Sequence, residues 1–168
     1  GIDEAMRNKL TVEQADALMG RPMGIPKTGV FGLYDLIGID LMVDVVASLR
    51  SILPEGDAFH AIGGKNEMIS AMIADGYTGD KGLGGFYMKG DDGTELARPL
   101  SGAGEALKAP RARDKALPDA TIRAADAAAS RGEPLLEIIA GNDDCARFCR
   151  RVLARVLAYA ASLVPEVT

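Results

Sequence analysis

The stretch Val30–Leu53 reads VFGLYDLIGIDLMVDVVASLRSIL, and it decides the fold that the sequence predicts. Apolar residues lie on nearly all sides of a helix drawn through it, which predicts a helix that is buried on several sides. Pro54 and Gly56 end this helix, while Gly32 and Gly38 inside it favour close packing or a break. The stretch is long enough to cross a bilayer, but its aspartates and its arginine would be costly there. We therefore interpret it as a core helix of a soluble protein.

A helix and a glycine-rich segment are predicted on each side of this stretch. The helix Thr11–Met19 begins with a capping box, in which a Thr hydroxyl and a Gln side chain satisfy free backbone amides. The loop Gly20–Gly29 contains several prolines and glycines, which exclude regular structure. Asn66–Asp75 is typical of a short helix with one apolar face. In the glycine-rich segment Gly76–Gly93, Phe86–Met88 predicts one short strand.

The second half of the chain is predicted to be helical after a linker. Residues 97–117 are small, polar and basic and contain prolines, a composition typical of a linker. We expect helices over Asp119–Ser130, Pro134–Ala140 and Asp143–Val164, and we expect the first and last of these to pack against Val30–Leu53. The sequence therefore predicts an all-α fold, a helical bundle with little or no sheet.

The last of these helices carries a stripe of apolar residues spaced three and four positions apart, the spacing of a helix that packs against another helix. We expect this stripe either to meet a second copy of the chain in a symmetric dimer or to pack on Val30–Leu53 within one chain. The stripe consists of Cys145, Cys149, Val152, Val156, Tyr159 and Leu163.

Composition narrows the class of protein. The chain has 168 residues, of which 48% are hydrophobic, and a formal net charge of −5. These values exclude a disordered chain and argue against a nucleic-acid partner. Two cysteines form no disulfide framework and suit a reducing, cytoplasmic location. The single histidine, His60, excludes a histidine-rich metal site. We expect no membrane partner, and since the chain has no initiator Met we expect it to be part of a longer protein.

No cluster of residues supplies a complete catalytic set. Gly82–Tyr87 has only the first two glycines of a dinucleotide fingerprint, so we interpret it as a flexible turn that holds an aromatic anchor. We interpret His60 as a capping or surface residue. Cys145 and Cys149 are one helical turn apart, and we interpret them as small core residues because further metal ligands do not cluster with them. We assign no metal-binding residue.

Three aspartates in Val30–Leu53 need polar partners. Asp40 and Asp44 share one helix face, whereas Asp35 lies roughly 140° around the helix from Asp40. We interpret all three as structural, in contact with neighbouring helix N-termini or with Arg and Lys side chains.

Four motifs, taken in order, resemble one protein family. Leu10–Pro22 reads LTVEQADALMGRP, Ile25–Phe31 reads IPKTGVF, Leu33–Asp40 reads LYDLIGID, and Gly79–Tyr87 reads GDKGLGGFY. Together they resemble the C-terminal helical domain of 3-hydroxyacyl-CoA dehydrogenases over Ile2–Met88.

The resemblance also implies a division of the chain. Residues 1–96 would form a first C-terminal helical domain and 97–117 a linker. Residues 118–168 would form a connector helix and the opening helices of a truncated second copy. The last assignment follows because Arg151–Val167 is similar to the opening helix of the repeated domain in the long multifunctional fatty-acid oxidation proteins.

The same resemblance implies an NAD-dependent oxidation of (S)-3-hydroxyacyl-CoA to 3-ketoacyl-CoA in β-oxidation. In the family, NAD and the catalytic His–Glu pair belong to an N-terminal Rossmann domain. We expect that domain to be missing from this chain, so we assign it no catalytic and no cofactor-binding residue and expect it to be inactive alone. Acyl-CoA and NAD would be bound in the full-length protein.

The loop Gly20–Gly29 is expected to face the missing domain beside the acyl chain. Its substrate-side candidates are Lys27, Thr28 and Phe31, although a core position suits Phe31 equally well. We expect a homodimer. The alternative function is a non-enzymatic helical module that binds a partner protein through the apolar stripe.

Overall fold

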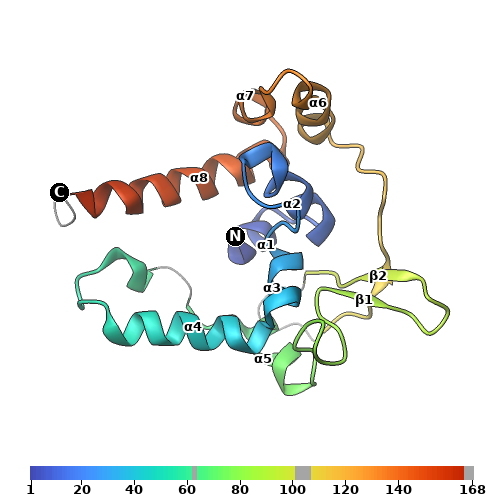
Figure 1. Ribbon diagram of the computed structural model, residues 1–168, viewed down its shortest axis with the longest axis vertical. Coiled ribbons are helices and arrows are strands. Elements are labelled where there is room, and N and C mark those ends of the chain that lie inside the picture. Colours follow the sequence, from blue (N-terminus) through green and yellow to red (C-terminus); the bar gives the residue numbers. More distant parts are fainter. Residues whose placement is uncertain (62–63, 101–106, 165–168) are drawn as a thin grey trace.

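The computed structural model describes residues 1–61, 64–100 and 107–164, and these residues fold mainly into helices (Figure 1). The all-α fold class is confirmed, with one small sheet added. None of the described helices is long and apolar enough to cross a membrane. The elements are α1 (Ile2–Arg7), α2 (Val12–Leu18), η1 (Arg21–Met23), α3 (Phe31–Ile37), α4 (Ile39–Ile52), η2 (Ala58–Ala61), α5 (Glu67–Ala74), β1 (Tyr87–Lys89), β2 (Glu95–Ala97), β3 (Arg111–Ala112), α6 (Ala120–Ala129), α7 (Pro134–Ala140) and α8 (Asp144–Ser162).

Helix α2 begins with the predicted capping box. The backbone amide of Gln14 donates to the Thr11 hydroxyl at 3.2 Å, and the backbone amide of Thr11 donates to the Gln14 side chain at 2.8 Å. The Gln14 side chain also donates to both carboxylate oxygens of Asp119, each at 3.0 Å. Because Asp119 precedes α6, the cap joins the two halves of the chain.

Gly38 divides the predicted Val30–Leu53 helix into α3 and α4. Its φ is +112°, a left-handed value that favours glycine, and an added Cβ would lie 2.7 Å from the Lys81 side chain. The chain therefore turns sharply at this residue. The prediction of one continuous helix is wrong, and the break that Gly38 suggested is present.

Helix α4 is much more exposed than its sequence predicts. Within it only Ile39 is buried. Several of its large apolar side chains are between 37% and 76% exposed, namely Leu41, Val43, Val45, Leu49 and Ile52. The expectation of burial on several sides is therefore wrong for α4, and the chain presents an apolar face there.

The hydrophobic core is continuous from the first half of the chain to the second. Phe31 and Phe86 are both fully buried and meet edge to face, with their ring centroids 4.7 Å apart. The core also includes Leu18, Met72, Ile138, Cys145, Phe148 and Cys149.

A three-stranded antiparallel sheet joins the glycine-rich segment to residues that the sequence predicted as linker. Strands β1 and β2 form a hairpin that pairs Met88 with Leu96, and β2 pairs with β3 through Leu96 and Ala112. The hairpin turn contains Gly93 with φ +81°. Because β3 lies within 97–117, that segment is partly ordered as a strand.

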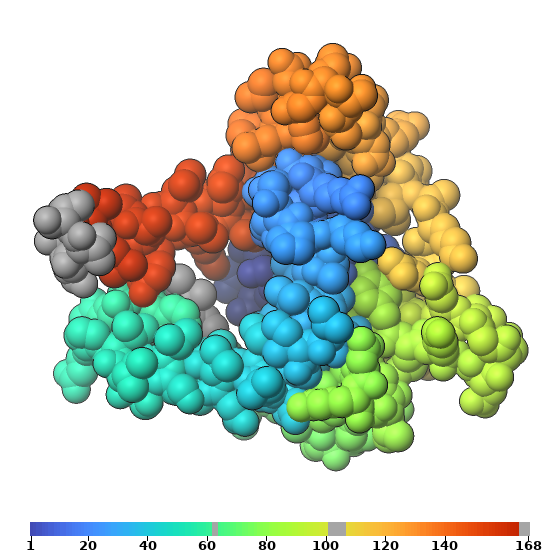
Figure 2. All heavy atoms as spheres, viewed as in Figure 1, coloured from blue at the N-terminus to red at the C-terminus, as the bar shows by residue number. Residues whose placement is uncertain are grey.

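Helices α6, α7 and α8 pack on the first half differently from the prediction. Helix α8 (red in Figure 2) packs on α1, α2, α6 and α7, whereas α4 (teal) packs on α3 and α5. The expected packing of Asp119–Ser130 and Asp143–Val164 on Val30–Leu53 is therefore wrong, although the rings of Phe59 and Tyr159 approach to 6.3 Å between centroids.

A buried carboxylate holds α8 against α1. Glu4 is only 2% exposed, and its side chain accepts hydrogen bonds from Asn8 at 2.9 Å and Arg151 at 3.0 Å. Burial raises the pKa of Glu4, but these hydrogen bonds outweigh burial and the pKa is lowered overall. Arg151 therefore fixes α8 against α1.

Candidate functional site

A cleft of about 650 Å³ lies where α2, the loop after it, α3 and β1 meet the extended segment that follows β3. Acidic, basic and hydroxyl side chains line it together, which distinguishes it from the apolar core. Its lining residues are Glu13, Asp16, Ala17, Lys27, Thr28, Gly32, Asp35, Asp80, Tyr87, Glu95, Arg113, Asp114, Lys115 and Leu117.

Asp16 in α2 caps the beginning of α3. Its carboxylate accepts hydrogen bonds from the backbone amides of Phe31 at 2.7 Å and Gly32 at 2.9 Å. Gly29 has φ +69°, and a Cβ there would lie 2.5 Å from the Asp16 carboxylate, so only glycine fits. Burial raises the pKa of Asp16 despite these hydrogen bonds.

Asp35 in α3 is held by the start of β1. It is 3% exposed and accepts from the backbone amides of Phe86 at 2.9 Å and Tyr87 at 2.7 Å. A Cβ on Gly85 would overlap the Asp35 carboxylate. Burial raises the pKa of Asp35 to about 6, and the negative charges of Asp80 and Asp16 add to the increase.

Tyr87 presents a buried polar atom at the cleft. Its hydroxyl is buried and faces the Asp16 carboxylate. Burial raises its pKa above the usual range, and the charge of Asp16 raises it further. The Arg113 guanidinium lies over the Tyr87 ring, 4.6 Å from the centroid.

A buried ion pair fixes the segment after β3 against α2. Arg111 donates to the two carboxylate oxygens of Glu13 at 3.0 and 3.1 Å, and the Asp114 backbone amide donates to Glu13 at 3.0 Å. Glu13 is 4% exposed, and these hydrogen bonds lower its pKa although burial alone raises it. The clasp between Glu13 and Arg111 therefore positions Arg113 and Lys115 at the cleft.

The family model for the 3-hydroxyacyl-CoA dehydrogenase C-terminal domain matches residues 2–89, more than half of the chain. The chain belongs to the 3-hydroxyacyl-CoA dehydrogenase family. The matched range contains Asp16, Asp35 and Tyr87, so one side of the cleft is built from the family domain. Arg113 and Lys115 lie beyond that range.

Proteins with related sequences carry names from fatty-acid oxidation. A protein of Rickettsia prowazekii named as a fatty acid oxidation complex trifunctional enzyme is 29% identical over 99% of this chain and 21% of its own length. A Rickettsia felis protein of the same name is 28% identical over 98% of this chain and 21% of its own length. A Deinococcus radiodurans protein named as a 3-hydroxyacyl-CoA dehydrogenase is 33% identical over 59% of the chain and 28% of its own length.

The chain thus spans about a fifth of the length of the two rickettsial relatives. No solved structure matches it significantly.

The structure brings two of the three substrate-side candidates of this dehydrogenase domain into the cleft. Lys27 is exposed and Thr28 is half-buried, and both line it. The Phe31 ring is fully buried in the core against Phe86, and only its backbone amide takes part, through Asp16.

Sequence reasoning missed Asp16, Tyr87 and Arg113 as cleft residues. Asp16 lies in an ordinary amphipathic helix, and its partners are 15 and 16 positions away. Arg113 was assigned to a linker. No short-range pattern marks these residues, because their roles depend on contacts between distant segments.

The other polar residues that the sequence singled out do not line the cleft, except Asp35. Asp40 pairs with Lys81 at 2.7 Å, while Asp44 is exposed. The His60 ring nitrogen lies 2.9 Å from the Pro54 carbonyl, beyond the end of α4, which is consistent with a capping role. Cys145 and Cys149 are buried and unpaired. The described residues contain no cluster of His, Cys, Asp or Glu that could hold a metal ion.

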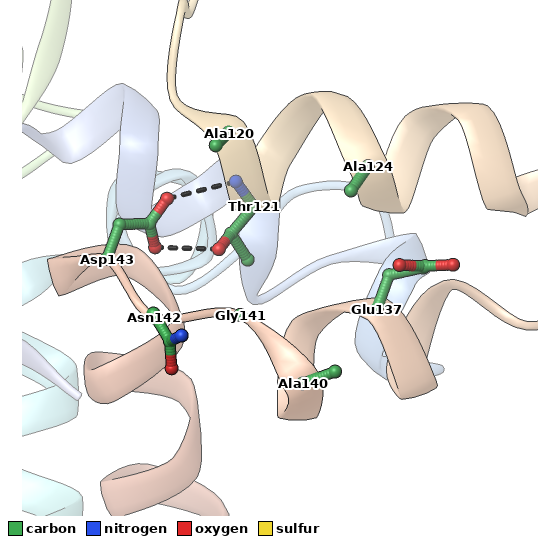
Figure 3. A pocket seen from close by; sticks show the side chains of 8 residues that line it. All are labelled: Ala120, Thr121, Ala124, Glu137, Ala140, Gly141, Asn142 and Asp143. Atoms are coloured by element: carbon green, nitrogen blue, oxygen red, sulfur yellow. Dashed lines mark hydrogen bonds between the residues drawn. The ribbon is translucent and has the colours of Figure 1, made fainter.

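A second pocket, of about 500 Å³, lies between α6, α7 and the start of α8 (Figure 3). Asp143 accepts hydrogen bonds from the Thr121 amide at 2.9 Å, the Thr121 hydroxyl at 2.7 Å and the Ala146 amide at 2.9 Å. These hydrogen bonds outweigh burial and lower the pKa of Asp143. Because the Asp143 carboxylate caps α8 and three alanines are among the other lining residues, the pocket serves the packing of helices.

Proposed function

We propose that this chain is the C-terminal, substrate-side and subunit-contact domain of an NAD-dependent 3-hydroxyacyl-CoA dehydrogenase in fatty-acid β-oxidation. The observation that carries the proposal is the family match over residues 2–89, which includes one side of the charged cleft. The names of the relatives support the same reaction, the oxidation of a 3-hydroxyacyl-CoA. Both cysteines are unpaired, which supports a cytoplasmic location.

The substrate side is the cleft that Lys27 and Thr28 line. The loop that carries them is stiffened by proline and held at its end by Asp16. A rigid loop with an exposed cation and a half-buried hydroxyl suits a surface that meets the thioester and the NAD-binding domain. Phe31 supports the loop from within the core.

The subunit contact is formed by α4 and the outer half of α8. The stripe on α8 divides into two parts: Cys145, Cys149 and Val152 are buried within the chain, whereas Val156 is 59% exposed. Leu157 beside it is 58% exposed, and α4 carries several exposed apolar side chains of its own. Exposed apolar surface of this extent supports a homodimer.

The proposal assigns hydride transfer to NAD bound by an upstream domain, so the chain alone is inactive. The described sheet is antiparallel and short, unlike the parallel sheet that presents a helix N-terminus to a dinucleotide. Calorimetric titration of this chain with NADH should therefore show no micromolar binding. The longer protein should oxidise (S)-3-hydroxyacyl-CoA and form NADH.

Two results would contradict this proposal. One is saturable NADH binding by the chain alone, and the other is a longer protein without dehydrogenase activity. The second result would favour the alternative, a helical interaction module, for which the exposed faces of α4 and α8 are the supporting observation.

A further inference from the structure

Arg98 is a buried cation that lies outside the charged cleft. The residue is 3% exposed and directly follows β2. Its backbone amide donates to the Phe86 carbonyl at 2.8 Å, so it continues the pairing of β2 with β1. Because side chains alternate along a strand, the Arg98 side chain lies on the face of the sheet opposite to Tyr87 and Ala97. Its surroundings are therefore separate from the cleft that Tyr87 lines.

The Arg98 guanidinium contacts only uncharged groups among the described residues. Its Nε donates to the Gly85 carbonyl and its Nη1 donates to the Lys108 carbonyl, each at 3.4 Å. Its central carbon lies 4.2 Å from the centroid of the Tyr77 ring. No carboxylate of the described residues forms an ion pair with it, and its Nη2 is buried there without a hydrogen bond.

These contacts leave a buried positive charge incompletely stabilised. A guanidinium carries five N–H donors, and Arg98 uses two of them at the long limit of hydrogen-bond distance. A buried charge without an opposite charge is strongly unfavourable, and an unsatisfied donor adds to the cost. Arg111 shows the contrast, because both oxygens of the Glu13 carboxylate accept from it. An oxyanion at Nη2 would give Arg98 the same kind of partner.

Arg98 also lies where the three strands of the sheet come together. Gly85 is two residues before β1, Arg98 directly follows β2, and Lys108 is three residues before β3. The guanidinium donates to the backbone of the first and the last of these segments. An anion bound to it would therefore strengthen a contact that holds all three strands.

From this arrangement we propose that Arg98 is the centre of an anion site, which takes a small oxyanion of the phosphate or carboxylate type at Nη2 and the adjoining Nη1. The enclosure of Nη2 favours a small ion over a bulky ligand. The inference goes beyond the proposed function, since the site is on the other face of the sheet from the cleft. Its effect is to stabilise the sheet.

The test measures the melting temperature of this chain in phosphate, in acetate and in chloride at equal ionic strength. R98K keeps the charge without the planar fork, and R98M removes the charge at a similar side-chain length. The matched control is R123M, because Arg123 is exposed on α6. E105Q tests for a counter-ion within the chain, since Glu105 is seven positions further along and lies outside the described residues.

We expect a saturable rise in the melting temperature of the unsubstituted chain. Phosphate at about ten times its dissociation constant should raise it by about 3–6 °C relative to chloride. R98K and R98M should lose this rise, whereas R123M and E105Q should keep it. A rise in phosphate alone would assign the site to phosphate, and a rise in acetate alone would assign it to a carboxylate. Hydrogen exchange of the Arg98 amide should slow in the same solutions, while that of α6 should not.

The inference is overturned if neither phosphate nor acetate stabilises the unsubstituted chain, or if R98K and R98M are stabilised as strongly as that chain. It is also overturned if E105Q alone responds, because Glu105 would then be the partner of Arg98. R98K keeps the test decisive if R98M does not fold, because a lysine retains the buried charge.

Discussion

Gly85→Ala should destabilise the fold strongly, because the new Cβ would occupy the position of the Asp35 carboxylate. Gly85 does not have a left-handed φ, so the effect tests close approach alone. The carboxylate would have to leave the amides of Phe86 and Tyr87, which it holds at 2.9 and 2.7 Å. Phe86 is fully buried, so its amide would find no water in exchange.

The expected magnitude follows from these two hydrogen bonds. A hydrogen bond to a charged group contributes about 1.5–3 kcal/mol, so loss of both, with partial relaxation of the loop, should cost about 3–5 kcal/mol. That is a large part of the roughly 5–15 kcal/mol that stabilises a typical domain. The variant should remain folded at low temperature and unfold at a much lower urea concentration.

Urea unfolding followed by circular dichroism measures this change. Gly56→Ala is the matched control, since a Cβ there meets no atom within 4 Å and its φ is not left-handed. The control should lie within about 1 kcal/mol of the unsubstituted chain. A Gly85→Ala variant that also lies within 1 kcal/mol, with an unchanged dependence on urea, would refute the assigned role of the glycine.

Three further predictions concern charge, substrate and assembly. Burial raises the pKa of Asp35 in the folded chain to about 6, from an ordinary value of 3.8. The free energy of unfolding should therefore be highest below pH 4 and fall by roughly 3 kcal/mol as the pH rises through 6. In the D35N variant, the urea midpoint should change less over this pH range. K27A should raise KM for acyl-CoA several-fold in the longer enzyme without changing Tm, and unchanged kinetics would remove Lys27 from the site. V156E should convert a dimer into a monomer in sedimentation at micromolar concentration. The control A154E, on the opposite face of α8, should leave the dimer intact. An unsubstituted chain that sediments as a 17.6 kDa monomer would refute the dimer.

Local patterns predicted much of the helical structure. The Thr11 capping box, the Asp143 cap and the helices near Asn66, Pro134 and Asp143 follow from signals within a few residues, and the structure contains them. The burial of these helices could not be predicted from such local signals. Apolar residues occur on nearly all sides of α4, yet most of its apolar side chains are exposed. An apolar pattern does not say whether the surface that covers it belongs to the same chain.

The candidate site is formed almost entirely by contacts between residues that are far apart in the sequence. Asp35 was correctly interpreted as structural, but its partners are backbone amides 51 and 52 positions away rather than a helix N-terminus or a cation. Arg111 reaches Glu13 across 98 positions, which turns a segment that was predicted as linker into one wall of the cleft. Proline and glycine content indicates an irregular backbone, and such a backbone can still be held firmly by buried ion pairs.

The motif Gly82–Tyr87 resembles part of a dinucleotide fingerprint for a physical reason. A phosphate-binding turn needs backbone amides that point at an anion and a missing Cβ that lets the anion approach. The turn at Gly85 has both features, but its anion is the Asp35 carboxylate of the same chain. Because the Asp35 carboxylate already fills this turn, a pyrophosphate cannot bind there. The turn instead joins α3 to β1 and holds Tyr87 at the cleft. The anion-binding chemistry of the fingerprint is therefore used inside the fold.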